Sequence, residues 1–271
     1  MLRAIVVGGG IAGLSASVAL RRAGHIVHVY EKTQLDNEVG AAINVPPNAA
    51  RFLVGQGTGS WGLDPVRSRF VKATTLEWCD PFTTAAAKPP SESRATILLS
   101  HANNAARYGA ELWLAHRVDL HAALRRLATQ AADDGDKVPA APPVTIHPNA
   151  QVVHYGVWLA CLLSSYHANA LVIAVEDPDV PSITLASGEI VEADVVIGAD
   201  GIHSIASEAV LGYENEAVTP AHYNYCYRFL IPASVLEADP DTRFWNVGSE
   251  GKSRIFADNE KGRRLVAGDM T

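Results

Sequence analysis

Three glycines near the start of the chain have the spacing of a phosphate-binding turn. Gly8, Gly10 and Gly13 form a Gly-x-Gly-x-x-Gly pattern that follows an apolar run and precedes small and aliphatic residues. The first glycine permits the turn, the second lets the backbone approach a pyrophosphate, and the third lets a helix pack closely on a strand. The pattern predicts dinucleotide binding, and the alternative is a glycine turn kept only for close packing.

A carboxylate follows at the distance that such a site requires. Glu31 ends a second apolar run, residues 26–30, where it can accept hydrogen bonds from an adenosine ribose. Because this acid would repel a 2′-phosphate, the loop favours FAD or NAD over NADP.

The second candidate site is the sequence ADVVIGADGIHS, residues 193–204. An apolar strand here delivers Asp200 and Gly201 to a turn that opens a helix. The carboxylate can hold a sugar hydroxyl, and the glycine leaves backbone room for a phosphate. Asp-Gly is also an ordinary turn and helix-cap pair. The motif therefore indicates a second part of a nucleotide site only because the glycine loop is present as well.

Other classes of site lack the residues that they need. The ten histidines contain no HxxxH or HxH pair, and His116 and His121, five residues apart, do not share one helical face, so no metal site is expected. No GxSxG sequence supplies a nucleophilic serine. A net charge of −7 argues against a nucleic-acid surface, and short basic runs such as Arg21-Arg22 are expected on solvated helix faces. Three scattered cysteines favour a reducing compartment, the cytoplasm.

The hydrophobic pattern predicts the elements that position these residues, beginning with a βαβ unit. No membrane span is expected, because glycines interrupt the first apolar run and polar residues interrupt the apolar segment 157–175. Strands are expected over residues 3–7, 26–30, 69–78, 194–198, 224–231 and 254–256, and from 183 onward, and helices over 11–23, 47–54, 119–132 and from 201 to about 210.

Together these motifs resemble the FAD-dependent aromatic monooxygenases, the salicylate- and hydroxybenzoate-hydroxylase-like enzymes of the fungal type. The resemblance also includes GAAINVPPNAARFL, LAHRVDLHAAL and GADGIHS, in the order of the family. It implies an α/β fold in which a Rossmann-type FAD-binding domain is interleaved with a partial β-sheet substrate domain. The implied FAD-binding domain comprises residues 1–75, 101–156 and 176–212, the substrate domain 76–100 and 213–271, and 157–175 is an insert, either a retained intron or an unusual apolar element.

The resemblance implies roles for individual residues. Ala42 would lie where the backbone approaches FAD, and Arg117 would bind the cofactor, although on its own it reads as a cation at a helix entry. Arg228 resembles an arginine near flavin and substrate, which makes it the candidate catalytic residue; a surface salt bridge is the alternative. The cofactor-binding residues are then Gly8, Gly10, Gly13, Glu31, Ala42, Arg117, Asp200 and Gly201.

The implied reaction is reduction of FAD by NADH or NADPH, followed by O₂-dependent hydroxylation of a small aromatic substrate, phenolic or benzoate-like. Two departures weaken the assignment: Ser207 stands where the family has an arginine, and Phe256 where relatives carry a tyrosine. The family's third cofactor motif is expected beyond residue 271, which predicts weak or no FAD retention by the isolated chain. A flavin oxidoreductase that inserts no oxygen and an inactive nucleotide-binding remnant are the competing interpretations.

Overall fold

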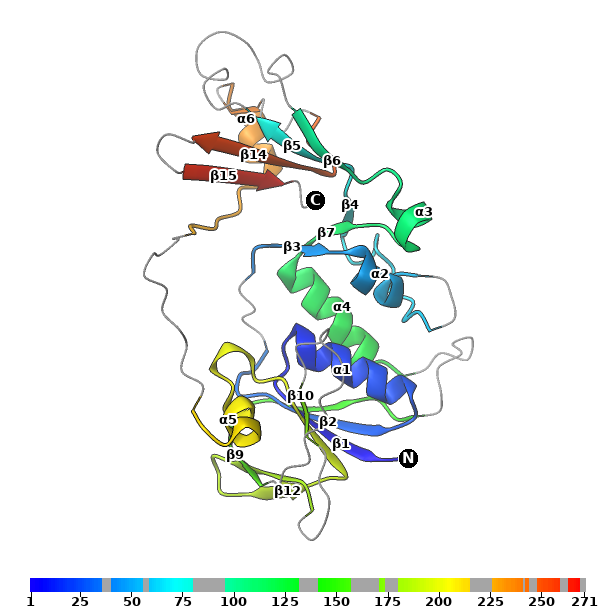
Figure 1. Cartoon of the computed structure of the whole chain (residues 1–271), viewed down its shortest axis with the longest axis vertical. Coiled ribbons are helices and arrows are strands. Elements are labelled where there is room, and N and C mark those ends of the chain that lie inside the picture. The colour runs from blue at the N-terminus through cyan, green and yellow to red at the C-terminus, as the bar shows by residue number, and fades with distance from the viewer. Residues whose placement is uncertain are drawn as a thin grey trace. The chain divides into compact units, whose positions relative to one another are not determined.

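The computed structural model describes eleven ranges of the chain, which contacts group into two compact units (Figure 1). The first unit comprises Met1–Glu38 and His121–Asn224, and the second Val39–Leu120 and Tyr225–Thr271. Residues 39–75 and 101–120 thus group with the second unit, whereas the implied domains put them with the FAD-binding part; the assignment by function stays a prediction. The described residues are 1–35, 40–55, 59–79, 96–131, 141–156, 171–173, 180–214, 226–240, 242–243, 248–258 and 263–268.

The first unit is built on a five-stranded sheet in the order β10-β13-β1-β2-β8. Four strands are parallel, and only the edge strand β10 runs antiparallel to its neighbour β13. The predicted strands 3–7 and 26–30 are confirmed, and the one at 194–198 begins one residue later. The bounds are β1 Arg3–Val7, β2 Ile26–Tyr30, β8 Thr145–His147, β10 Leu171–Ile173 and β13 Val195–Gly198.

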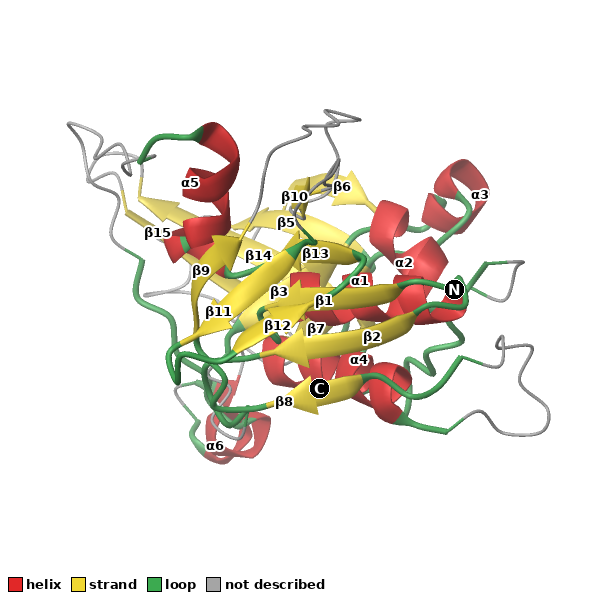
Figure 2. Ribbon diagram, turned by 90° about the horizontal axis from the view of Figure 1, so that it is seen from below, coloured by secondary structure: helices red, strands yellow, loops and turns green. Residues whose placement is uncertain are grey.

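Helix α1 (Ile11–Arg22) covers one face of this sheet, as the predicted βαβ unit requires (Figure 2). Val6, Val27 and Val29 are fully buried, as are Leu14 and Val18 on the helix. Alternation along each strand sends the neighbouring side chains to the opposite face, where they meet a second apolar layer.

That second layer is a three-stranded antiparallel sheet in the order β12-β11-β9. Tyr155 and Ile183 of this sheet pack in one buried cluster with Ile5, Val7 and Tyr30 of the main sheet. The strand predicted from residue 183 onward is confirmed as β11, and β12 follows it along the chain. The bounds are β9 Val152–Gly156, β11 Ser182–Leu185, β12 Ile190–Glu192 and, for the helix beside them, α5 Ile205–Leu211.

Arg21 corrects one prediction about the basic runs. It was expected on a solvated helix face, but it is only 3% exposed. Its guanidinium donates to the carbonyls of Leu127 and Ala128, at 3.1 and 3.0 Å, near the end of α4 (Arg117–Thr129). The last carbonyls of a helix lack intrahelical donors, so they can accept hydrogen bonds from a buried guanidinium. The pattern showed a basic pair but not the second helix beside it.

The described residues of the second unit form two sheets. One is a three-stranded sheet in the order β3-β7-β4. The helix predicted at 47–54 follows β3 along the chain and is confirmed within a residue as α2. A four-stranded sheet in the order β15-β14-β5-β6 contains the predicted strand at 254–256. The predicted strand 69–78 is divided between two sheets, as β4 and β5. The bounds are β3 Ala42–Val45, α2 Pro47–Leu53, β4 Val71–Lys72, β5 Thr75–Cys79, β6 Thr96–Ser100, α3 Asn104–Tyr108, β7 Trp113–His116, α6 Ala233–Ala238, β14 Lys252–Asp258 and β15 Arg263–Gly268.

The predicted strand at 224–231 is wrong for its described part. Residues 226–231 form neither helix nor strand, and Tyr227 and Phe229 are 89% and 67% exposed. An alternating apolar pattern makes a strand only where a neighbouring strand supplies hydrogen bonds.

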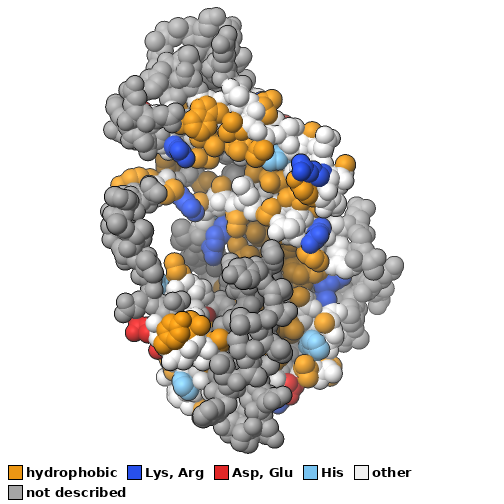
Figure 3. Space-filling model, viewed as in Figure 1, with side chains coloured by type: hydrophobic (Ala, Val, Ile, Leu, Met, Phe, Trp, Pro, Cys, Tyr) orange, Lys and Arg blue, Asp and Glu red, His pale blue; other side chains and the backbone are white. Residues whose placement is uncertain are grey.

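Apolar side chains also stand exposed on the four-stranded sheet, among them Ile97, Leu99 and Val266. Figure 3 shows apolar atoms gathered on the visible face where Figure 1 draws β5, β6 and β14.

Within the described ranges, no helix has the length and apolar character needed to cross a membrane. Of the apolar segment 157–175, only Leu171–Ile173 is described, as β10; the rest lies outside the described residues.

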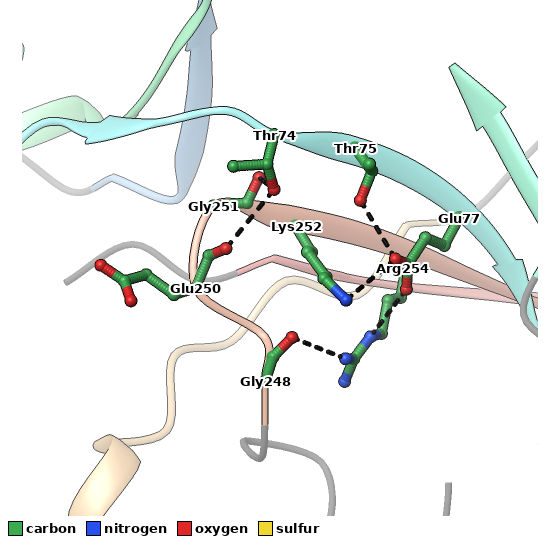
Figure 4. A network of polar contacts seen from close by, with 8 residues as sticks. All are labelled: Thr74, Thr75, Glu77, Gly248, Glu250, Gly251, Lys252 and Arg254. Carbon is green, nitrogen blue, oxygen red and sulfur yellow. Dashed lines mark hydrogen bonds and ion pairs between the residues drawn. The ribbon is translucent and has the colours of Figure 1, made fainter. Parts of the chain in front are cut away.

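A buried carboxylate joins two parallel strands of the four-stranded sheet. Glu77 of β5 is 5% exposed. It meets Lys252 Nζ at 3.1 Å and Arg254 Nε at 3.3 Å, both from β14, and accepts a hydrogen bond from Thr75 at 3.1 Å (Figure 4). Burial alone would raise the pKa of Glu77, but the hydrogen bonds from Lys252 and Thr75 outweigh it, so the pKa lies below its ordinary value.

Replacing this carboxylate tests the ion-pair network. Glu77→Gln is expected to lower the free energy of unfolding by about 1–3 kcal/mol at pH 7, because two cations lose their buried partner. A lowered folded-state pKa stabilises above the unfolded carboxyl pKa, near 4.5, and that contribution is lost as pH falls through the folded value. Denaturant unfolding at several pH values should therefore show wild type and variant converging in acid.

Thr75→Val is the matched control, since it removes one neutral donor from the same carboxylate. Its loss should be about 1 kcal/mol and should shrink less in acid than that of Glu77→Gln, because this bond supplies only part of the lowered pKa. A Glu77→Gln loss that is independent of pH would contradict the assigned pKa direction.

Candidate functional site

The three glycines of the turn differ in their backbone surroundings. Gly8 has φ +106°, and a Cβ placed there would overlap the carbonyl oxygen of Ala199. A Cβ at Gly13 would overlap the Gly8 carbonyl oxygen, so helix and turn approach too closely for any side chain. A Cβ at Gly10 would meet nothing within 4 Å. The first and third glycines are thus required by the fold itself, whereas the second borders open space.

Glu31 lies against this turn and is already hydrogen-bonded. Its Oε2 accepts from the Gly9 amide at 2.6 Å, and its Oε1 accepts from the Thr33 amide and hydroxyl, each at 2.9 Å. The residue is 8% exposed. A carboxylate has about four acceptor positions, so room remains for a ribose hydroxyl beside these donors. Glu31, which is predicted to bind the ribose, therefore also anchors the glycine turn.

His121 holds the same glycine from another element. Its Nε2 lies 2.7 Å from the Gly9 carbonyl oxygen, in a buried position on α4. In the sequence analysis this histidine was considered only for a metal site, which was rejected. Its contact spans residues far apart in the chain, so no local motif could indicate it.

Asp200 lies beside the glycine turn, at the end of β13, which pairs with β1. Its Oδ2 accepts from the amides of Ile205 and Ala206, at 2.9 and 3.1 Å, and from the Tyr155 hydroxyl at 3.2 Å. In the described part of the chain no donor meets its Oδ1. The amides that open α5 are thus satisfied by Asp200 itself, and one carboxylate oxygen is left for a ligand hydroxyl.

Tyr155 is a partner of Asp200 that the sequence did not single out. It is 3% exposed, and burial, together with the nearby Asp200 charge, raises the pKa of its hydroxyl. The phenol therefore remains a hydrogen-bond donor at all ordinary pH values.

Asp200→Asn tests whether this carboxylate organises the start of α5. The amide keeps one oxygen but loses the charge, so we expect the unfolding free energy to fall by about 1–2 kcal/mol. Tyr155→Phe, which keeps the ring and removes one donor, should cost about 1 kcal/mol. If thermal denaturation ranks Tyr155→Phe as the more damaging change, the capping role of Asp200 is wrong.

Two other residues of this motif, Gly201 and Ser207, lie at and after the turn that follows β13. Gly201 has φ +85°, and a Cβ there would meet nothing within 4 Å, at the start of a 3₁₀ turn (Gly201–His203). Ser207, which replaces the family arginine, donates from its hydroxyl to the Ser204 carbonyl at 2.7 Å, and its amide donates to the Ser204 hydroxyl at 3.1 Å. Ser207 therefore pairs with Ser204, the N-terminal cap residue of α5.

The other predicted site residues belong to the second unit. Ala42 opens β3 opposite His116 of β7, and the Arg117 amide donates to the Ala41 carbonyl at 3.1 Å. His116 Nε2 lies 3.1 Å from the Gly40 carbonyl oxygen. The structure thus brings Ala42 and Arg117 together where β7 passes into α4.

The predicted catalytic residue, Arg228, lies in the exposed segment 226–231. Phe256 is buried on β14. The glycine turn, Glu31 and Asp200 are gathered in the first unit, and the predicted roles of all these residues stay predictions.

The described residues contain no group of three or more His, Cys, Asp or Glu side chains able to hold a metal. Cys79 and Cys226 are free thiols. Burial raises the pKa of the Cys79 thiol, which disfavours the nucleophilic thiolate.

Known proteins match this chain in both sequence and fold. Residues 6–36 match the family model described as an NAD(P)-binding Rossmann-like domain. The FAD-dependent monooxygenase cfoG of Aspergillus candidus is 43% identical over 98% of this chain and 52% of its own length. Hispidin-3-hydroxylase of Neonothopanus nambi is 29% identical over 89% of this chain and 46% of its own length.

A solved structure, Klebsiella pneumoniae HpxO complexed with FAD and uric acid, superimposes with a TM-score of 0.58. It is 21% identical and aligns over 98% of this chain and 52% of its own, so this likeness supports the fold alone. The chain spans about half the length of the curated relatives it matches. By sequence the chain is similar to FAD-dependent monooxygenases over about half of their length, and the predicted resemblance is confirmed.

Proposed function

We propose that this chain binds FAD and works as an aromatic-ring monooxygenase that uses NAD(P)H and O₂. The observation that carries the proposal is the glycine turn, which Glu31 holds by the Gly9 amide while the backbone at Gly10 stays open. A turn of this shape, between a strand and a helix N-terminus, suits a pyrophosphate.

The residues of the first unit fit the adenosine diphosphate part of the cofactor. Gly8, Gly10 and Gly13 would surround the pyrophosphate, and Glu31 would accept from the ribose. Asp200 supports the same assignment, because its Oδ1 meets no donor within the described residues and the glycine turn lies next to it. Gly201, where a side chain would meet nothing, would leave backbone room beside it.

Ala42 and Arg117 are proposed as the cofactor contacts of the second unit. Their proximity in β3 and α4 supports a shared role, and the arginine would supply charge to a phosphate. Arg228 is proposed to act near flavin and substrate, and its exposure is compatible with either that role or a surface ion pair.

When bound, FAD supplies the redox and oxygen chemistry of the reaction. The protein's part would be to orient the aromatic ring and to exclude water. A phenolic or benzoate-like substrate is proposed, since one relative is named hispidin-3-hydroxylase. The cytoplasm is proposed as the compartment because the cysteines Cys79 and Cys226 are free.

The test is a coupled assay on the protein expressed from its own gene, with flavin content measured first. NADH or NADPH oxidation should rise when a panel of phenols and hydroxybenzoates is offered, and each NAD(P)H consumed should yield hydroxylated product. Bound flavin with substrate-independent oxidation and no oxygenated product would favour a flavin oxidoreductase instead. A protein that takes up no flavin at all would contradict the proposal.

A further inference from the structure

A buried histidine fixes the peptide between Gly9 and Gly10. His121 Nε2 lies 2.7 Å from the Gly9 carbonyl oxygen, and the side chain is 2% exposed. Because a carbonyl oxygen only accepts, Nε2 must carry the proton and donate it to this bond. The donor comes from α4, whereas the turn joins β1 to α1.

The hydrogen bond determines where the Gly10 amide points. In a trans peptide the carbonyl and the following N–H point in opposite directions, and the described chain contains no cis peptide. Holding the Gly9 carbonyl toward His121 therefore turns the Gly10 N–H away from it. Over the described residues no acceptor meets that amide, and the backbone at Gly10 is open.

Glu31 completes the hold on Gly9 from a third element. Its Oε2 accepts from the Gly9 amide at 2.6 Å, so both backbone groups of one glycine are paired with buried side chains. Rotating either peptide plane would leave a buried donor or acceptor without its partner, which costs about 1–3 kcal/mol. The turn is therefore set in one orientation before any ligand arrives.

We propose that His121 is a positioning residue of the dinucleotide site, which aims the Gly10 amide at the cofactor pyrophosphate through its bond to the Gly9 carbonyl. This rests on the proposed function, because it assumes that a dinucleotide binds at the glycine turn. The histidine itself need not touch the ligand. Its effect should appear in nucleotide affinity more than in the stability of the unit.

Three substitutions at this position separate positioning from simple packing. Gln can place its amide nitrogen near the position of Nε2 and keep the donor. Asn is polar as well, but its shorter side chain stops near the position of Nδ1. Leu fills the space with no donor at all. The variants His121→Gln, His121→Asn and His121→Leu thus differ in the one contact at issue.

Leu124→Ala is the control for lost stability. Leu124 lies on the same helix and is fully buried, and no hydrogen bond joins its side chain to the turn. Removing a buried leucine costs about 2–5 kcal/mol. This variant lowers the unfolding midpoint without changing the Gly9 carbonyl contact.

The experiment is isothermal titration of the 271-residue chain and each variant with ADP, alongside denaturant unfolding. His121→Leu and His121→Asn should bind ADP about 10-fold more weakly than wild type, and His121→Gln within about 3-fold, from the usual strength of one hydrogen bond. Leu124→Ala should keep the wild-type affinity at a lower unfolding midpoint.

Equal ADP affinities of wild type, His121→Leu and His121→Asn would overturn the inference alone. Affinities that follow the unfolding midpoint across all variants, Leu124→Ala included, would also overturn it, because they would indicate a structural role. A wild-type chain that binds no ADP would overturn the proposed function, and this inference with it. If His121→Leu does not fold, the comparison between Gln and Asn decides.

Discussion

Gly10→Ala is expected to reduce FAD affinity by 10-fold or more while changing the unfolding free energy by about 1 kcal/mol or less. Gly10 has φ −73° and ψ −176°, which any residue adopts, and an added Cβ would meet no protein atom within 4 Å. The methyl group would instead occupy the open side of the turn, where the pyrophosphate is proposed to approach. Flavin fluorescence titration and denaturant unfolding measure the two effects separately.

Gly13→Ala is the matched variant, with the same added methyl group three residues away. Its Cβ would overlap the Gly8 carbonyl oxygen, which is backbone and cannot rotate aside. We expect a loss of about 3 kcal/mol in unfolding free energy, at the upper end of what overpacking costs. Equal stabilities of the two variants, or unchanged FAD affinity in Gly10→Ala, would contradict the assigned roles of these glycines.

Glu31→Gln is the second substitution with a large expected effect. Oε1 and Oε2 both accept hydrogen bonds, from Thr33 and from Gly9, so a Gln amide group must face a donor on one side. The unfolding free energy should fall by about 1–3 kcal/mol, the cost of a buried unpaired donor. ADP affinity should fall by about 10-fold, because the anchor of the turn and the ribose acceptor are the same group.

Thr33→Val separates the two functions of this carboxylate. It removes the hydroxyl donor to Oε1 and keeps the Thr33 amide and the Gly9 contact. Stability should fall by about 1 kcal/mol with ADP affinity nearly unchanged. A Thr33→Val variant that loses as much nucleotide affinity as Glu31→Gln would show that the whole loop, and not Glu31, governs binding.

The glycine turn was predictable because its requirements are local. Strand, turn and helix follow one another within residues 3–22, and a positive φ at Gly8 restricts the residue type directly. Glu31 was predictable for the same reason, since β2 returns beside β1 and delivers its end to the turn.

Contacts between distant elements could not be predicted in this way. His121 reaches Gly9 only because α4 packs near the turn, and Tyr155 reaches Asp200 only because the small sheet packs on the large one. Arg21 was likewise predicted on a solvated face, because the sequence does not show that α4 supplies carbonyl acceptors beside it. The sequence pattern marks such side chains as polar residues on a helix or strand, and it cannot say which buried group they meet.

At 226–231 the sequence pattern predicted a strand that the structure does not contain. Tyr227, Phe229 and Ile231 alternate as in a half-buried strand, yet all three are exposed and none belongs to a sheet. Alternation describes how side chains would be sorted if a strand formed, but it does not provide the partner strand. The proposed role of Arg228 consequently rests on the family resemblance.

The most direct measurement of the central claim is titration of the chain with FAD, ADP and FMN under identical conditions. The glycine turn, Glu31 and Asp200 are proposed to recognise the adenosine diphosphate part of the cofactor. FAD and ADP should therefore bind at one shared site and compete with each other, whereas FMN, which lacks that part, should bind at least 10-fold more weakly. FMN binding as tight as that of FAD, or no binding of either FAD or ADP, would contradict a dinucleotide site at this turn.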